Sequence, residues 1–231
     1  MFLPILVSFL SAAQSPTALS EDFEGGLCVS PCRGAAWAFA QEVEGKLDLV
    51  AAGPKGNVLR ARTGPRRDRV PKAALVARPA KAGPGAHVSV GFDLLIPEGA
   101  PLNSVHLVDI ECATCGEEGN PGIRLYLRNG RLRIDRAKIG VRHAWTDGAA
   151  PMLVAGRWHR IALDVLLGDA DGSARVRLDG ETVLRGEGAT ILEAKRGFDA
   201  GADRVQIGIT ASSNSVPAEA YFDGIRIEVT R

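Results

Sequence analysis

Aromatic residues are scarce in this sequence. They make up 5% of its 231 residues and include three tryptophans. A tryptophan-rich surface, which many cellulose- and chitin-binding modules use to stack sugar rings, is therefore not expected. Excess charge of either sign is also missing, because 28 Lys and Arg residues face 27 Asp and Glu residues. Nucleic-acid-binding domains are normally strongly basic, so the balance argues against a nucleic-acid partner.

Long hydrophobic runs are absent as well, and the only notable one lies at the N-terminus, MFLPILVSFL. Its apolar stretch of about nine residues is too short to span a bilayer, so no membrane span is expected. The run is followed by small residues that fit a cleavage site at Ser11-Ala12-Ala13, with a second candidate at Ala18-Leu19-Ser20. A buried terminal strand is the alternative, which Pro4 disfavours. We therefore predict a signal peptide over residues 1–19 and a secreted or periplasmic, extracytoplasmic protein.

Cysteine is limited to two close pairs, Cys28/Cys32 (CVSPC) and Cys112/Cys115 (CATC). In an exported chain, disulfides are the leading interpretation, and pairing within each cluster is the simplest of the three connectivities. The alternative is a four-thiolate zinc site, because the CxxC half has zinc-ligand spacing. The CxxxC half fits that alternative less well.

No segment keeps a helical period over three turns, whereas strand patterns are abundant. The clearest is Arg157 to Leu184, where Ile161, Leu163 and Val165 alternate with polar residues before the turn GDADG. Asp179-Gly180 closes a second turn, and Asn129-Gly130 predicts a two-residue hairpin between 123–128 and 131–135. Ser104 to Cys112 has apolar residues at both odd and even positions, so both faces of this strand should be buried, which predicts a central strand. Further strands are expected at 45–50, 57–63, 73–78, 88–96, 203–211 and 219–229.

About a dozen short strands separated by turns predict an all-β, antiparallel two-sheet sandwich. With no linker and no internal repeat, residues 20–231 are expected to form one domain.

Several phrases occur in an order that resembles a known superfamily. They are DFEGG (22–26), a following Trp37, NGRLRI (129–134), GRWHRIALDV (156–165), VRLDGETV (176–183), VQIGI (205–209) and AYFDGIRI (220–227). The chain resembles the concanavalin A-like lectin/glucanase superfamily, and within it the laminin-G-like and polysaccharide-lyase-like jelly rolls. The resemblance implies a jelly-roll fold. It leaves the activity open, because the superfamily includes lectins, glycanases, lyases and adhesion modules.

Catalytic motifs of that superfamily are largely missing. The glycanase pattern E-x-D-x-x-E does not occur, and Asp109 and Glu111 are the only carboxylates paired on one strand face. Alginate-lyase-like members carry an Arg-rich strand, a Gln-x-His strand and a Tyr-x-Lys strand. Here Arg60 and Arg62 partly match the first and His106 the second, but the strand of Tyr221 lacks the lysine. The first hypothesis is therefore a non-catalytic carbohydrate-recognition or adhesion module.

The polar faces of the predicted strands are rich in arginine, which suits an acidic polysaccharide as the partner. Arginine binds carboxylate or sulfate bidentately, and an aromatic ring can stack on a sugar. The alternative is a solvated face whose arginines pair with Asp135, Asp164 and Glu181 across strands. Arg160, Arg175 and Arg177 extend the basic face of the 123–135 hairpin if they share its sheet. The candidate ligand-binding residues are Arg124, Tyr126, Arg128, Arg133, Arg175, Arg177 and, in a polar loop, Trp145.

The second hypothesis is a polysaccharide lyase that cleaves uronate-containing glycans by β-elimination. Such an enzyme needs a group that neutralises the uronate carboxylate and a base that takes the C5 proton. His106, Tyr126 and His143 are the candidate bases, and Arg62 or Arg124 the candidate neutralising groups.

A structural Ca²⁺ is a further expectation, since β-sandwich carbohydrate modules often join the first strand to the last through acidic residues. Asp22, Glu24 and Asp223 have that layout, and hard oxygen ligands suit Ca²⁺. The alternative is that Asp223 caps the turn before Gly224.

Overall fold

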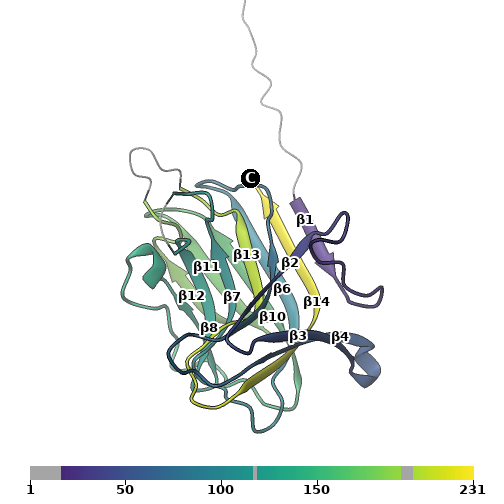
Figure 1. Ribbon diagram of the computed structural model, residues 1–231. Helices are drawn as coiled ribbons and strands as arrows, with labels where there is room; N and C mark the ends of the chain where they lie inside the picture. Colours follow the sequence, from purple (N-terminus) through teal and green to yellow (C-terminus); the bar gives the residue numbers. More distant parts are fainter. Residues whose placement is uncertain (1–16, 117–118, 194–199) are drawn as a thin grey trace, which may run out of the picture.

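A computed structural model describes residues 17–116, 119–193 and 200–231. Most of the predicted signal peptide, residues 1–16, lies outside the described residues. The described chain folds into two packed layers of antiparallel strands and contains no α-helix (Figure 1). The predicted all-β sandwich is confirmed. No helix among the described residues is long and apolar enough to cross a membrane.

The first layer is an eight-stranded sheet in the order β12-β11-β10-β6-β14-β4-β3, with β1 paired to β14. Its strands are β1 (Thr17–Glu21), β3 (Lys46–Ala51), β4 (Asn57–Thr63), β6 (His87–Leu95), β10 (Trp158–Leu166), β11 (Ser173–Leu178), β12 (Glu181–Glu187) and β14 (Ala218–Thr230). A short 3₁₀ turn, η1 (Gly53–Lys55), joins β3 to β4.

The second layer is a six-stranded sheet in the order β2-β5-β13-β7-β8-β9. Its strands are β2 (Trp37–Glu42), β5 (Lys72–Ala77), β7 (Val105–Glu111), β8 (Gly122–Arg128), β9 (Arg131–Asp135) and β13 (Arg204–Ser212), and a 3₁₀ turn, η2 (Ala137–Ile139), follows β9. β7 lies between β13 and β8, as its apolar pattern predicted.

The predicted hairpins form because their turn residues accept positive φ. Asn129 and Gly130 have φ of 52° and 73°, and Asp179 and Gly180 have φ of 53° and 91°. Positive φ at both central residues is the backbone of a type I′ turn, whose twist matches that of the flanking strands. The Asn129-Gly130 turn fixes the register of β8 against β9, with Tyr126 opposite Arg133.

Alternation along the strands builds the core between the two layers. Phe92 of β6 and Phe222 of β14 are fully buried, with ring centroids 5.7 Å apart. Facing them from the other sheet are buried aliphatic residues such as Leu107 and Leu125. Burial of each large apolar side chain contributes about 1.5–3 kcal/mol to folding, so this interlayer core supplies most of the stabilisation.

One expectation about the sheets is wrong. Arg175 and Arg177 lie on β11 of the eight-stranded sheet, whereas β8 and β9 belong to the six-stranded sheet. The chain crosses from one layer to the other between β9 and β10, so two hairpins that are adjacent in sequence end on different faces of the molecule. Arg160 of β10 is separated from the β8–β9 hairpin in the same way.

Both predicted disulfides are present, Cys28–Cys32 and Cys112–Cys115. With their sulfurs joined in pairs, the cysteines supply no thiolates, which removes the four-thiolate zinc alternative. The second bridge closes the turn after β7. There the carboxylate of Asp203 accepts hydrogen bonds from the Ala113 and Thr114 backbone amides at 2.6 and 3.1 Å.

Candidate functional site

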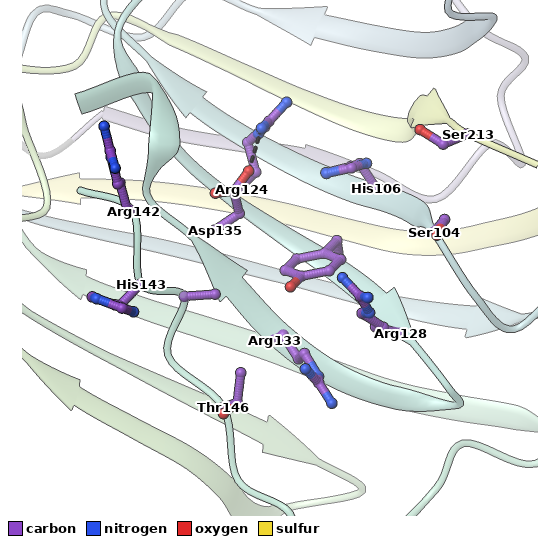
Figure 2. Close-up of a pocket in the computed structure, with 12 residues that line it drawn as sticks. Ser104, His106, Arg124, Arg128, Arg133, Asp135, Arg142, His143, Thr146 and Ser213 are labelled. Carbon is purple, nitrogen blue, oxygen red and sulfur yellow. Dashed lines mark hydrogen bonds and ion pairs between the residues drawn. The ribbon is translucent and has the colours of Figure 1, made fainter. Parts of the chain in front are cut away.

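A cleft of about 540 Å³ lies on the outer face of the six-stranded sheet. Outward-pointing residues of β7, β8 and β9 form its floor, and the loop after β9 borders it (Figure 2). Its lining is rich in arginine and also holds two histidines and a tyrosine. The lining residues are Ser104, His106, Arg124, Tyr126, Arg128, Arg133, Asp135, Arg142, His143, Ala144, Thr146 and Ser213.

Sheet register explains why the sequence brings these side chains together. His106 of β7 pairs with Tyr126 of β8, and Tyr126 pairs with Arg133 of β9, so the three form a row across the sheet. Arg124 and Asp135 form the next row on the same face. A register shift between His106 and Val108 keeps the imidazole on this outer face. Bulges of this kind commonly redirect a side chain beside a functional site.

His106 is the most perturbed group in the cleft. Burial, followed by the positive charge of Arg124, lowers its pKa to about 4. Its ring stacks on Tyr126 with centroids 5.2 Å apart. A backbone hydrogen bond to Ala211 raises the pKa, as expected when a ring N–H donates to a carbonyl. The buried Nδ1 has no hydrogen-bond partner in the described structure. The imidazole is therefore neutral at pH 7, and its ring is partly exposed to the cleft.

The arginines of the cleft divide into paired and unpaired groups. Arg124 forms an ion pair with Asp135, and the pKa of Asp135 is lowered because hydrogen bonds from Ala137 and Arg124 outweigh the effect of burial. Arg128, Arg133 and Arg142 make no hydrogen bond or ion pair with other described residues. Unpaired guanidinium groups around one hollow favour an anionic ligand, because each presents a planar fork of donors that fits a carboxylate.

Residues 136–146, which we call the cleft-wall loop, carry Arg142 and His143. In the view of Figure 2 these two residues lie across the cleft from His106. Arg136 holds the loop by donating to the His143 carbonyl at 3.1 Å and by stacking 4.0 Å from the Trp145 ring centroid. The loop returns to the sheet through a bridge between Trp145 and Ile134.

Lys138 of η2 fixes the other side of the cleft-wall loop. Its Nζ forms an ion pair with buried Glu111 and lies 3.4 Å from the carboxylate of buried Asp109. Gln206 also donates to Glu111, at 2.7 Å, and Thr210 to Asp109, at 2.8 Å. Burial, together with the charge of Asp109, raises the pKa of Glu111. Asp109 and Glu111, the carboxylate pair that the sequence placed on one strand face, therefore have a structural role: they fix η2 to the sheet.

The structure places the other candidate residues outside the cleft. Arg62 borders a different hollow, near Thr63 and Glu98, and its guanidinium is 3.6 Å from Asp48. Arg177 pairs with Asp164 at 3.0 Å, as the cross-strand alternative predicted. The same alternative holds for Arg124 and Asp135.

Trp145 closes an edge of the sandwich instead of standing free in solvent. It is partly buried against the core, below Arg136. A Cβ atom placed on Gly186 of β12 would approach the indole to 2.1 Å, so glycine is needed there for the two to pack. Trp145 thus lies between β9 and β12 at the border between the two layers.

The residues proposed to bind Ca²⁺ have other partners. Glu24 accepts a hydrogen bond from the Asn57 amide at 3.0 Å, and Asp22 accepts one from the Glu24 amide at 3.2 Å. Asp223 lies 3.4 Å from Lys55 Nζ and accepts a hydrogen bond from Gly224 at 2.7 Å. Within the described ranges, no group of three or more His, Cys, Asp and Glu side chains is arranged to hold a metal ion. The structural Ca²⁺ at this position stays a prediction.

Arg142, Ser104 and Ser213 are cleft residues that the sequence analysis missed. Arg142 follows η2 in an irregular segment without periodicity, and the two serines lie in turns at the ends of β7 and β13. Only the three-dimensional path of these turns brings them to the cleft.

No protein-family model matches the chain, and no curated protein sequence does. Solved structures with the same fold exist. An endo-β-1,4-glucuronan lyase from the fungus Trichoderma reesei has a TM-score of 0.68 at 16% identity, with 92% of this chain and 94% of that chain covered. The cellulose-induced protein Cip1 has a TM-score of 0.64 at 17% identity over 90% and 96%. A mutant of the alginate lyase Aly36B, solved in complex with alginate trisaccharide, has a TM-score of 0.60 at 11% identity over 94% and 99%.

These likenesses confirm the expected fold. The chain has the same two-sheet sandwich fold as these structures. At such low identities the similarities show only the fold, and the activity depends on the residues of the cleft.

Proposed function

We propose that this protein is a polysaccharide lyase that cleaves uronate-containing glycans by β-elimination in the cleft on the six-stranded sheet. The observation that carries the proposal is the neutral, partly exposed His106 imidazole in the same cleft as unpaired Arg128 and Arg133. His106 thus supplies a base in the same cleft as two arginines that can bind a carboxylate. The lyase activities named for two proteins of the same fold support the proposal.

In the proposed reaction, Arg128 and Arg133 bind the uronate carboxylate and stabilise the negative charge that develops on it. The His106 imidazole, which is partly exposed to the cleft, removes the C5 proton, and the electron pair of the C5–H bond forms the C4=C5 double bond. The C4–O bond breaks, and the Tyr126 hydroxyl gives its proton to the leaving oxygen. The protonated imidazole and the phenolate then exchange protons with solvent, which restores the starting state.

Substrate binding adjusts the base. In the free protein the charge of Arg124 adds to burial in lowering the pKa of His106. A bound carboxylate brings a negative charge next to the ring, which favours the imidazolium that forms during proton transfer. The anionic substrate thus makes His106 a stronger base when it is needed.

Glucuronan, alginate and a heparin-type polymer are the test substrates, and the ultraviolet absorbance of the unsaturated product is the signal. Wild-type protein is expected to raise the absorbance on at least one polymer. His106→Gln, Tyr126→Phe and Arg128→Ala/Arg133→Ala are each expected to lower the rate by about 10²-fold or more. Arg67→Ala/Arg78→Ala, which changes two exposed arginines outside the cleft, is the matched control. A wild-type rate no higher than that of the His106 variant would refute catalysis.

A non-catalytic acidic-glycan-binding module is the second candidate. Arg128, Arg133 and Arg142 favour it, since three guanidinium groups without partners in the described residues bind carboxylates whether or not chemistry follows. Binding without product, measured by calorimetry on the same polymers, would select this candidate over the lyase.

We also propose that the protein acts outside the cytoplasm. Its two disulfides are typical of oxidising compartments, and its proposed substrates are extracellular polymers. N-terminal sequencing of protein recovered from the culture medium or periplasm tests this, with a mature terminus inside residues 14–21 as the expected result and purely cytoplasmic protein as the contrary one.

A further inference from the structure

A second hollow of about 440 Å³ lies on the outer face of the eight-stranded sheet. Strands β6, β10, β11, β12 and β14 form it, and none of its described lining residues is Trp, Tyr or Phe. Those residues are His87, Ser89, Asp164, Leu166, Ser173, Ala174, Arg175, Arg185, Gly186, Glu187 and Thr230.

Two arginines stand directly opposite each other in this hollow. Arg175 of β11 pairs in register with Arg185 of β12, and both side chains are exposed. Like charges in directly opposed positions of a sheet are destabilising, so the pair has a cost in the free protein. An anion between the two guanidinium groups removes that repulsion.

Nearby carboxylates do not satisfy the pair. Asp164 is opposite Arg175 in register, but it accepts hydrogen bonds from Ser89 and Arg177, each at 3.0 Å. Neither Arg175 nor Arg185 makes a hydrogen bond or ion pair with any residue of the described ranges. The neighbouring hydroxyl groups of Ser173 and Thr230 offer further donors beside them.

We propose that Arg175 and Arg185 form a second anion-binding site, which holds carboxylate or sulfate groups of an acidic polysaccharide away from the cleft. The identity of the polymer rests on the proposed function, while the anion chemistry rests on the arginine pair itself. Because the hollow and the cleft lie on different sheets, the second site anchors the protein to the polymer and raises the local concentration of cleavable segments near the cleft.

Affinity electrophoresis through gels that contain alginate, glucuronan or a heparin-type polymer tests the site. All proteins carry His106→Gln, so that the polymer stays intact. Arg175→Ala/Arg185→Ala is expected to weaken retardation, with a dissociation constant about tenfold higher for at least one polymer. The matched control, Arg67→Ala/Arg78→Ala, removes the same charge from two exposed arginines outside both hollows and is expected to behave like its parent.

The melting temperatures of the variants show whether they are folded. Loss of the repulsive pair is expected to leave the melting temperature unchanged or higher, and added polymer should raise it less in the Arg175/Arg185 variant than in the control variant. The proposal would be overturned if the two double variants were retarded equally, or if no acidic polymer retarded their parent. It would also be overturned if inorganic polyphosphate retarded the parent as much as the acidic polymers do. None of these results depends on product formation, so failure of the second site and failure of the lyase are distinguished.

Discussion

At the scale of single residues, His106 has the most strongly shifted pKa of the cleft. Its Nδ1 is buried without a partner in the described structure, and its pKa falls to about 4 because of burial and the charge of Arg124. A group in such a position is a candidate for function, since a buried nitrogen without a partner lowers stability and a structural role does not explain it. Tyr126, stacked against it, adds the hydroxyl group that the proposed elimination requires.

The depressed pKa of His106 makes a prediction about acid stability. The unfolded chain takes up a proton near pH 6.5, whereas the folded protein takes it up only near pH 4. Between these values the unfolded state binds more protons, so stability falls as the pH falls. The loss attributable to this residue is up to about 3 kcal/mol.

Urea denaturation of wild-type protein and His106→Gln across this pH window tests that prediction. The raised pKa of Glu111 acts in the opposite direction, but it is common to both proteins and cancels in the difference. His87→Gln, at an exposed position on the other sheet, is the matched control variant. Parallel curves for wild type and His106→Gln would show that burial does not hold the imidazole neutral.

The sequence predicted much of the cleft residue by residue. His106, Arg124, Tyr126, Arg128, Arg133 and His143 were all candidates, and all line one hollow. They could be predicted because regular alternation on β8 and β9 and the Asn129-Gly130 turn fix which side chains share a face. Arg62 and Arg175 fall elsewhere, because strand alternation gives the face of a sheet but does not say which sheet a strand joins. Trp145 falls elsewhere because it lies in a loop without alternation.

The cleft-wall loop is the decisive element of the site. Lys138 fixes it to the sheet through Asp109 and Glu111, while Arg136 and Trp145 hold its other arm. The sequence could not predict this arrangement. The contacts join residues almost thirty positions apart, and the loop has no periodicity of its own. By contrast, the β-hairpins on either side, with turns of two to six residues, followed directly from alternation and turn chemistry.

Replacing Lys138 by methionine is predicted to destabilise the protein by about 3–5 kcal/mol, because buried Asp109 loses its cation and buried Glu111 keeps only Arg204, 3.6 Å away. It is also expected to lower the affinity for acidic glycans, since the loop carries Arg142 and His143 to the cleft. Chemical denaturation measures the first effect and calorimetric titration the second. Lys46→Met, at an exposed lysine of β3, is the matched control.

A triple variant separates charge from packing. With Asp109→Asn and Glu111→Gln added to Lys138→Met, no buried carboxylate is left without its lysine, and part of the lost stability should return, while Arg204, 3.6 Å from Glu111, loses its carboxylate partner. A Lys138→Met protein as stable as the Lys46→Met control would contradict the role given to this ion pair.

At the scale of the whole molecule, the two layers carry the two proposed sites on their outer faces. The six-stranded sheet bears the cleft and the eight-stranded sheet bears the Arg175/Arg185 pair, while the shared core between them keeps both rigid. The sandwich itself was predictable, because about a dozen alternating strands without helices permit few other architectures.

The two disulfides are predicted to contribute moderately to this architecture. Each closes a loop of only a few residues, so a loop-closure model gives each about 2 kcal/mol. Reduction should therefore lower the urea midpoint while leaving a cooperative transition and an unchanged β-sheet circular dichroism spectrum. Collapse of the fold on reduction would contradict a scaffold held mainly by its core.

The most direct test of the central claim is mass spectrometry of a defined uronate tetrasaccharide after incubation with the protein. β-Elimination predicts one fragment that is lighter by one water than the corresponding hydrolytic fragment, and its absence with Arg128→Ala/Arg133→Ala. Fragments of hydrolytic mass, or an intact tetrasaccharide with each uronate type tested, would contradict a lyase cleft on the six-stranded sheet.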